Sequence, residues 1–168
     1  MMTRNLLTNV INEARRGSKF PKVHLLHGDM TDSEVAALYV HPQIKALVSL
    51  TRGEGYGLPI LEAAASGLPV IATGWSGHLD FLKYGKYVSI YYQLRDVHES
   101  RIDNNIFVPG SRWAYADEQD FKKRITKFRT SSATPREWAN DLKVALQDNF
   151  SLEHVCKLYD NTLGDYLK

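Results

Sequence analysis

The segment from Gly53 to Thr73 reads GEGYGLPILEAAASGLPVIAT and combines a loop, a helix and a buried strand. Three glycines in its first five residues indicate a tight loop whose main chain can approach a ligand closely. Pro59 predicts the start of a helix and Gly67 its end, because proline suits the first helical position and glycine the position just beyond the last. The apolar run PVIAT that follows, residues 69–73, predicts a buried strand.

Strands and helices alternate on both sides of this segment. We expect strands at residues 22–27, 45–50, 69–73, 88–92 and 112–115. We expect helices at residues 3–16, 31–39, 59–66, 78–82, 117–129, 135–149 and 152–167. Apolar strands that do not alternate with polar positions favour a parallel sheet covered on both faces. The sequence therefore predicts an α/β fold with a Rossmann-like, doubly wound parallel sheet, in a single domain that spans residues 1–168.

Composition and charge exclude several classes of protein. Hydrophobic residues make up 43% of the chain and charged residues 24%, which is typical of a globular protein and excludes a disordered one. A net charge of +2 gives no argument for binding nucleic acid or an anionic membrane. The single cysteine, Cys156, excludes an internal disulfide and favours a reducing, cytoplasmic location. We expect no transmembrane segment, because no apolar run reaches the roughly 18 residues that span a bilayer.

The loop of residues 51–57 is the most informative candidate site, because ligands of such sheets bind outside the carboxyl ends of the strands. It leads into a helix whose free amides and positive dipole end favour a phosphate or pyrophosphate. Glu54 and Glu62 would repel phosphate, but ionised carboxylates accept hydrogen bonds from sugar hydroxyls. The residues therefore predict a ligand with both phosphate and sugar, such as a nucleotide sugar. From the spacing alone, Glu62 could equally be a helix-dipole acid and Glu54 a solvated loop charge.

The same segment resembles the donor-site signature of the family 4 glycosyltransferases, which are group 1 glycosyltransferases of GT-B fold. Two glutamates separated by seven residues, a helix, and PVIA followed by Thr73 stand at that family's spacing, and GHLD at residues 77–80 continues the pattern. The resemblance implies that the chain corresponds to the C-terminal, donor-binding half of a GT-B enzyme. It implies a retaining transfer of a hexose from a nucleotide sugar to an unknown glycan or lipid acceptor, with no cofactor and no bound metal.

The resemblance also implies a role for each residue of the motif. Glu54 would contact the hexose of the donor and is the candidate catalytic residue, and Glu62 would bind the ribose hydroxyls. Asp29 and Met30, in the loop after the preceding strand, would frame the base. Amides that would face the sugar and diphosphate belong to Gly55, Tyr56, Gly57 and Leu58, after Gly53 has opened the loop.

Two features depart from the pattern of that family. Its phosphate-clamping Arg and Lys lie on the first strand of the donor domain and the loop after it, which nothing in residues 1–22 matches. The acceptor-binding N-terminal domain is also missing, and one wall of a cleft cannot position both reactants. We therefore expect a truncated glycosyltransferase that transfers little or nothing alone. Its exposed cleft face would favour self-association.

Other interpretations stay open beside this one. A non-catalytic nucleotide-sugar-binding or interaction module that retains the fold is the second hypothesis, and an epimerase of GT-B architecture fits the two-glutamate segment poorly. Arg52 could neutralise phosphate or be a solvated arginine. His78 could touch a ligand or be a polar residue at a helix start. His24 and His27 would project to opposite faces of a strand, so they are poor partners for a metal.

Overall fold

The computed structural model describes residues 2–17, 19–164 and 166, and the chain divides into two compact units, residues 1–31 and 32–168. The smaller unit contains helix α1 (Met2–Arg15). Its residues 19–31 form no helix or strand, and the side chains of Val23 and Leu26 are exposed. The expected strand at residues 22–27 is therefore wrong. A lone apolar run with no neighbouring strand in its unit has no partner for its main-chain groups.

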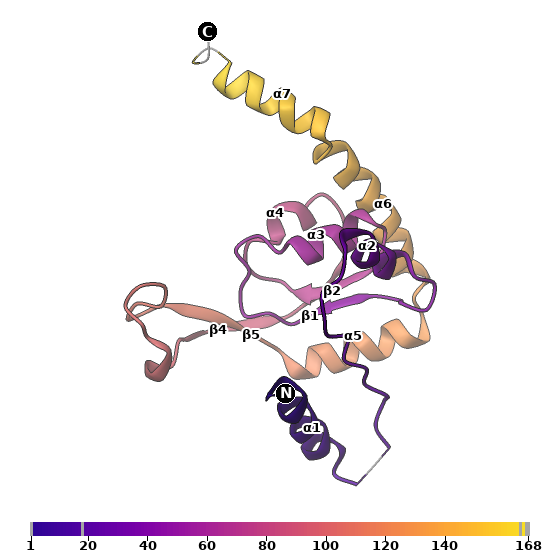
Figure 1. Cartoon of the computed structure of the whole chain (residues 1–168), viewed down its shortest axis with the longest axis vertical. Helices are drawn as coiled ribbons and strands as arrows, with labels where there is room; N and C mark the ends of the chain where they lie inside the picture. Colours follow the sequence, from indigo (N-terminus) through magenta and orange to yellow (C-terminus); the bar gives the residue numbers. More distant parts are fainter. Residues whose placement is uncertain (1, 18, 165, 167–168) are drawn as a thin grey trace. The chain divides into compact units, whose positions relative to one another are not determined.

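A parallel sheet organises the larger unit (Figure 1). In the described residues its order is β1-β2-β3, formed by β1 (Leu47–Ser49), β2 (Val70–Thr73) and β3 (Val88–Ile90). Val48 pairs with Ile71 in the parallel register of β1 and β2. Helices α3 (Leu58–Ala65) and α4 (Leu79–Leu82) lie between successive strands and make the crossovers that parallel pairing needs. The expectation of a parallel α/β sheet is confirmed.

Helices cover both faces of this sheet. On one face, Val70 and Ala72 of β2 pack with residues of α3, α4 and α6 (Ala133–Asn149). On the other face, Ile71 packs with Phe128 of α5 (Glu118–Thr130). All four residues of β2 are buried, as expected for a central strand with a helical layer on each side. This arrangement agrees with a Rossmann-like half of a GT-B protein.

The other helices complete the larger unit. Helix α2 (Asp32–Val40) packs against α3, and α7 (Leu152–Leu163) follows α6. The expected last helix reaches residue 167, which lies outside the described residues. Among the described helices, none has both the length and the apolar character that a membrane span requires.

An antiparallel hairpin follows the carboxyl end of β3 and extends away from the parallel sheet (Figure 1). It consists of β4 (Tyr92–Asp96) and β5 (Arg112–Ala116), with Arg95 opposite Trp113. The expected strand at residues 112–115 is present, but it belongs to this separate sheet and not to the parallel one. A purely parallel sheet is therefore an incomplete description. The segment from residue 88 to 96 contains two strands, and the second, β4, pairs antiparallel with β5.

The loop of this hairpin is stabilised by one carboxylate. Oδ1 of Asp103 accepts hydrogen bonds from the amides of Asn105, Ile106 and Phe107 at 2.8–2.9 Å, and η1 (Glu99–Arg101) precedes it. These main-chain bonds lower the pKa of Asp103 below its usual value, because they favour the ionised form. Residues 103–107 thus form an ordered loop that is anchored by Asp103.

The start of α5 provides a test of how this unit is stabilised. Asp117 caps the helix, since its side chain accepts a hydrogen bond of 2.7 Å from the amide of Asp120. We predict that Asp117→Ala lowers the free energy of unfolding by about 1 kcal/mol in urea denaturation, because a helix amide loses its acceptor. Glu118→Ala is the matched control, since the Glu118 side chain forms an exposed ion pair with Lys122, and such pairs contribute little to stability. Equal losses in both variants would contradict the capping role.

Candidate functional site

The candidate site lies where the parallel strands end. Because β1 and β2 are parallel, the loops that follow them, residues 50–57 and 74–78, leave the same edge of the sheet. The first loop is the glycine-rich segment singled out in the sequence. The structure therefore brings this loop, the start of α3 and the turn between β2 and α4 together in one place.

The glycine-rich loop is fastened to the β2–α4 turn through Glu54 and Ser76. The Ser76 hydroxyl accepts a hydrogen bond from the Glu54 amide at 2.9 Å and donates one to the Glu54 carbonyl at 2.8 Å. The Gly77 amide donates to that carbonyl at 3.1 Å. A Cβ at position 77 would lie 2.1 Å from the carbonyl oxygen of Gly55, so only glycine fits there. The two loops are thus held in contact by their main chains.

The start of α3 presents unpaired main-chain donors. Gly57 is the N-cap residue with φ 89°, a left-handed conformation that favours glycine. Pro59 has no amide hydrogen, so the helix begins without that donor. Within the described part of the chain, no acceptor is bonded to the amides of Gly55, Tyr56, Gly57 and Leu58. Free amides at the positive end of a helix dipole can bind an anion.

Glu54 stands beside this helix start. A Cβ built on Gly57 would lie 3.6 Å from the Cβ of Glu54, so the side chain leaves the loop next to the first helical residue. Glu54 is half-buried, and its carboxylate has no ion-pair or hydrogen-bond partner among the described residues. The carboxylate is therefore available as a hydrogen-bond acceptor for a ligand. The structure places Gly53 and Glu54 where the sequence predicts them, and their roles stay predictions.

Glu62 is held in position by a residue that the sequence did not single out. The hydroxyl of Tyr39 in α2 donates a hydrogen bond of 3.1 Å to Oε2 of Glu62 in α3. This bond leaves the other carboxylate oxygen for a ligand. A cavity of about 640 Å³ adjoins the pair and is lined by Asp32, Val35, Ala36, Tyr39, Glu62 and Ser66. No local pattern could have indicated Tyr39, because it is 23 residues from Glu62 and belongs to another helix.

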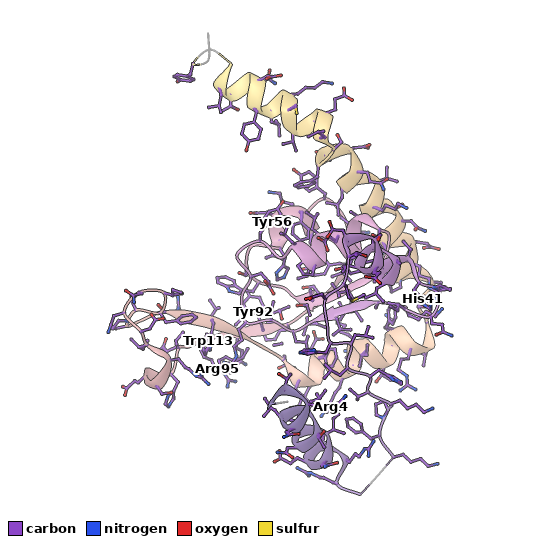
Figure 2. All side chains as sticks on the ribbon, in the orientation of Figure 1. Arg4, His41, Tyr56, Tyr92, Arg95 and Trp113 are labelled. Carbon is purple, nitrogen blue, oxygen red and sulfur yellow. The ribbon has the colours of Figure 1, made fainter. Side chains whose placement is uncertain are left out.

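The side chains of Tyr56 and His78 are part of the scaffold of the site. Tyr56 lies at the loop and is labelled in Figure 2. Its ring packs edge-on against Phe81 of α4, with the centroids 5.4 Å apart. His78 is fully buried, and its Nε2 lies 2.7 Å from the carbonyl oxygen of Thr73. His78 therefore links the end of β2 to the start of α4, which agrees with a polar residue at a helix start.

The remaining sequence candidates belong to the smaller unit. Asp29 and Met30 are exposed there, and the strand expected before them does not form. Their role in framing a base stays a prediction. Among the described residues, no group of three or more His, Cys, Asp or Glu side chains could hold a metal ion.

The contact between Tyr39 and Glu62 has a measurable titration. Burial, and then the hydrogen bond and negative charge of Glu62, raise the pKa of Tyr39 above its usual 10.0. Because the folded state favours the neutral phenol, the stability that this shift contributes is complete below about pH 10. It is lost as the pH rises through the folded-state pKa.

We predict that Glu62→Gln moves the pKa of Tyr39 back towards 10, since the substitution removes the charge but leaves burial in place. Nuclear magnetic resonance of ring-labelled tyrosine measures this pKa, and Tyr39→Phe assigns the signal. An unchanged Tyr39 pKa in Glu62→Gln would show that the two side chains are not in contact in solution.

Comparison with known proteins gives one match. A family model described as "Glycosyl transferases group 1" matches residues 8–112, a range that includes the glycine-rich loop, α3, β2 and the β2–α4 turn. No curated protein and no solved structure matches the chain significantly. The family match covers more than half of the chain and contains both glutamates of the site. The chain therefore belongs to the group 1 glycosyltransferases, a family whose function is glycosyl transfer.

Proposed function

We propose that this chain binds a nucleotide diphosphate sugar and forms the donor half of a retaining hexosyltransferase that needs no metal. The observation that carries the proposal is the row of unpaired amides from Gly55 to Leu58 at the start of α3, next to Glu54. The family match supports the reaction class, and the resemblance of the two-glutamate motif supports the identity of the donor. The acceptor is a glycan or a lipid.

In this proposal the chemistry of the donor is divided between the parts of the site. The loop amides and the dipole of α3 bind the diphosphate, because both favour negative charge. Glu54 accepts hydrogen bonds from hydroxyls of the hexose. Glu62, held by Tyr39, accepts hydrogen bonds from the ribose hydroxyls. Both carboxylates thus face neutral hydroxyl donors, which avoids their repulsion of the phosphates.

The same amides would assist departure of the nucleotide. When the bond between the sugar and the diphosphate breaks, negative charge builds up on the phosphate oxygen that leaves. Donors that are already fixed in place stabilise such charge without reorganising during the reaction. The hydrogen bonds between Glu54, Ser76 and Gly77 hold the loop in that way. This gives a source of leaving-group stabilisation that does not depend on a metal ion.

A binding module that does not transfer sugar is the second candidate. One observation favours it: residues 2–15 form helix α1 and residues 19–31 form no strand, so the described residues before α2 contain no strand to carry the clamp that the resemblance implies. Release of free hexose from nucleotide sugar by the purified chain, followed by anomer analysis, distinguishes the two candidates. Slow release of the retained anomer supports the transferase and contradicts the module.

The two glutamates should have different effects on ligand binding. We predict that Glu62→Ala weakens binding of both the nucleoside diphosphate and the nucleotide sugar by about 10- to 100-fold, since hydrogen bonds to a charged group are lost. Glu54→Ala should weaken only the nucleotide sugar, because only that ligand carries the hexose. Calorimetric titration with a panel of bases and sugars measures both affinities.

Glu137→Ala provides the matched control for these titrations. Glu137 is an exposed acid on α6 that lines none of the cavities beside Glu62, so both affinities should stay within twofold of the wild type. If Glu54→Ala and Glu62→Ala each lowered the affinity for both ligands equally, the division of roles would be contradicted.

A further inference from the structure

Arg52 immediately precedes the glycine-rich loop. Its side chain is exposed to solvent, and no acid among the described residues forms an ion pair with it. Its guanidinium carbon lies 4.5 Å from the ring centroid of Trp113 and 4.6 Å from that of Tyr115. Both aromatic residues belong to β5, two positions apart, so they project from the same face of the hairpin. The side chain is therefore stacked against two rings of an element that begins 60 residues further along the chain.

The main chain of Arg52 is fixed by the same strand. The amide of Ala114, between the two aromatic residues, donates a hydrogen bond of 3.0 Å to the carbonyl of Arg52. Inside the loop, the Thr51 hydroxyl donates to the Gly53 carbonyl at 2.9 Å. The hairpin thus holds position 52 by its side chain and its backbone, just before the chain enters the three glycines.

The rings that contact Arg52 also contact other residues of the hairpin. Phe107 packs edge-on against Trp113 with the centroids 5.4 Å apart, and the guanidinium carbon of Arg95 lies 5.0 Å from the Tyr115 centroid. Figure 2 shows Trp113 and Arg95 together on this hairpin. A second contact joins the hairpin to the other loop of the site, since the rings of Trp75 and Tyr92 pack with their centroids 5.6 Å apart. Both loops of the site therefore rest on the hairpin.

We infer that Arg52 is a positioning residue, which fastens the glycine-rich loop to the β4–β5 hairpin and so holds the loop amides ready for a diphosphate. The inference rests on the proposed function for the identity of that ligand. A glycine-rich segment has many accessible conformations, and its binding affinity falls with the fraction of time spent in the competent one. Two anchors restrict this loop, one at Arg52 on the hairpin and one at Glu54 on Ser76.

The planar guanidinium is essential to the role. It can contact the faces of both rings at once, whereas a lysine ammonium is a compact, strongly hydrated charge that cannot stack in this way. Arg52→Lys keeps the positive charge and removes the stacking, so it separates positioning from a charge effect on phosphate. Arg95→Ala is the matched control, because Arg95 stacks on the same Tyr115 ring but does not adjoin the loop.

Hydrogen exchange of the ligand-free protein tests the inference without reference to any ligand. We expect Arg52→Ala and Arg52→Lys to speed exchange of the Glu54 and Gly77 amides by about five- to tenfold, since the loop opens more often. Arg95→Ala should leave both amides within twofold of the wild type. Unchanged exchange in Arg52→Ala, or equal acceleration in Arg95→Ala, would overturn the inference.

Titration with nucleoside diphosphates adds the functional readout. Arg52→Ala should weaken binding of the nucleoside diphosphate by about tenfold and leave the affinity for the phosphate-free nucleoside unchanged. Trp113→Ala should have the same effect, and the double variant should be no worse than either single variant, because both break one contact. Recovery of affinity in Arg52→Lys, or additive losses in the double variant, would assign a direct charge contact and contradict positioning.

The two proposals fail in different ways. A wild-type chain that binds no nucleotide, while exchange still responds to Arg52→Ala, would contradict the proposed ligand and support the loop anchor. A chain that binds nucleotide through Glu62, but whose amide exchange does not change in Arg52→Ala, would support the proposed ligand and contradict the loop anchor.

Discussion

The hydroxyl of Ser76 forms the connection on which the candidate site depends. It hydrogen-bonds both the amide and the carbonyl of Glu54, and so joins the loop after β1 to the turn after β2. Ser76 has φ 91°, a conformation that costs a non-glycine residue about 1–3 kcal/mol. The surrounding contacts, including the close approach of Gly77 to the Gly55 carbonyl, keep the residue in that conformation. The strained turn at Ser76 thus holds the loop in a fixed position.

The parallel sheet explains why these segments meet at all. Parallel strands bring the carboxyl ends of β1 and β2 to one edge, and the crossover helix α3 begins there with its positive end towards the loop. The antiparallel hairpin then supports that edge through Arg52 and Trp75. The site consequently combines a helix dipole, free amides and two carboxylates. The β2–α4 turn, the β4–β5 hairpin and α2 hold these groups in place.

The sequence indicated the elements with local signals and missed those that depend on distant partners. The loop, α3 and β2 were predictable because Pro59, Gly67 and the apolar run of residues 69–73 mark their boundaries. The strand expected at residues 22–27 is absent because an apolar run alone does not supply a neighbour to pair with. The bond of Tyr39 to Glu62 and the stacking of Arg52 join segments far apart in sequence, which leave no spacing pattern.

Amide chemical shifts of the labelled full chain, recorded with and without a nucleoside diphosphate, show directly which amides bind the ligand. We expect the largest shifts at Gly55, Tyr56, Gly57 and Leu58, where free donors stand at the start of α3. Smaller shifts should follow at Ser76 and Gly77, because they share hydrogen bonds with the loop. Shifts confined to other parts of the chain, or no shifts at millimolar ligand, would contradict the account.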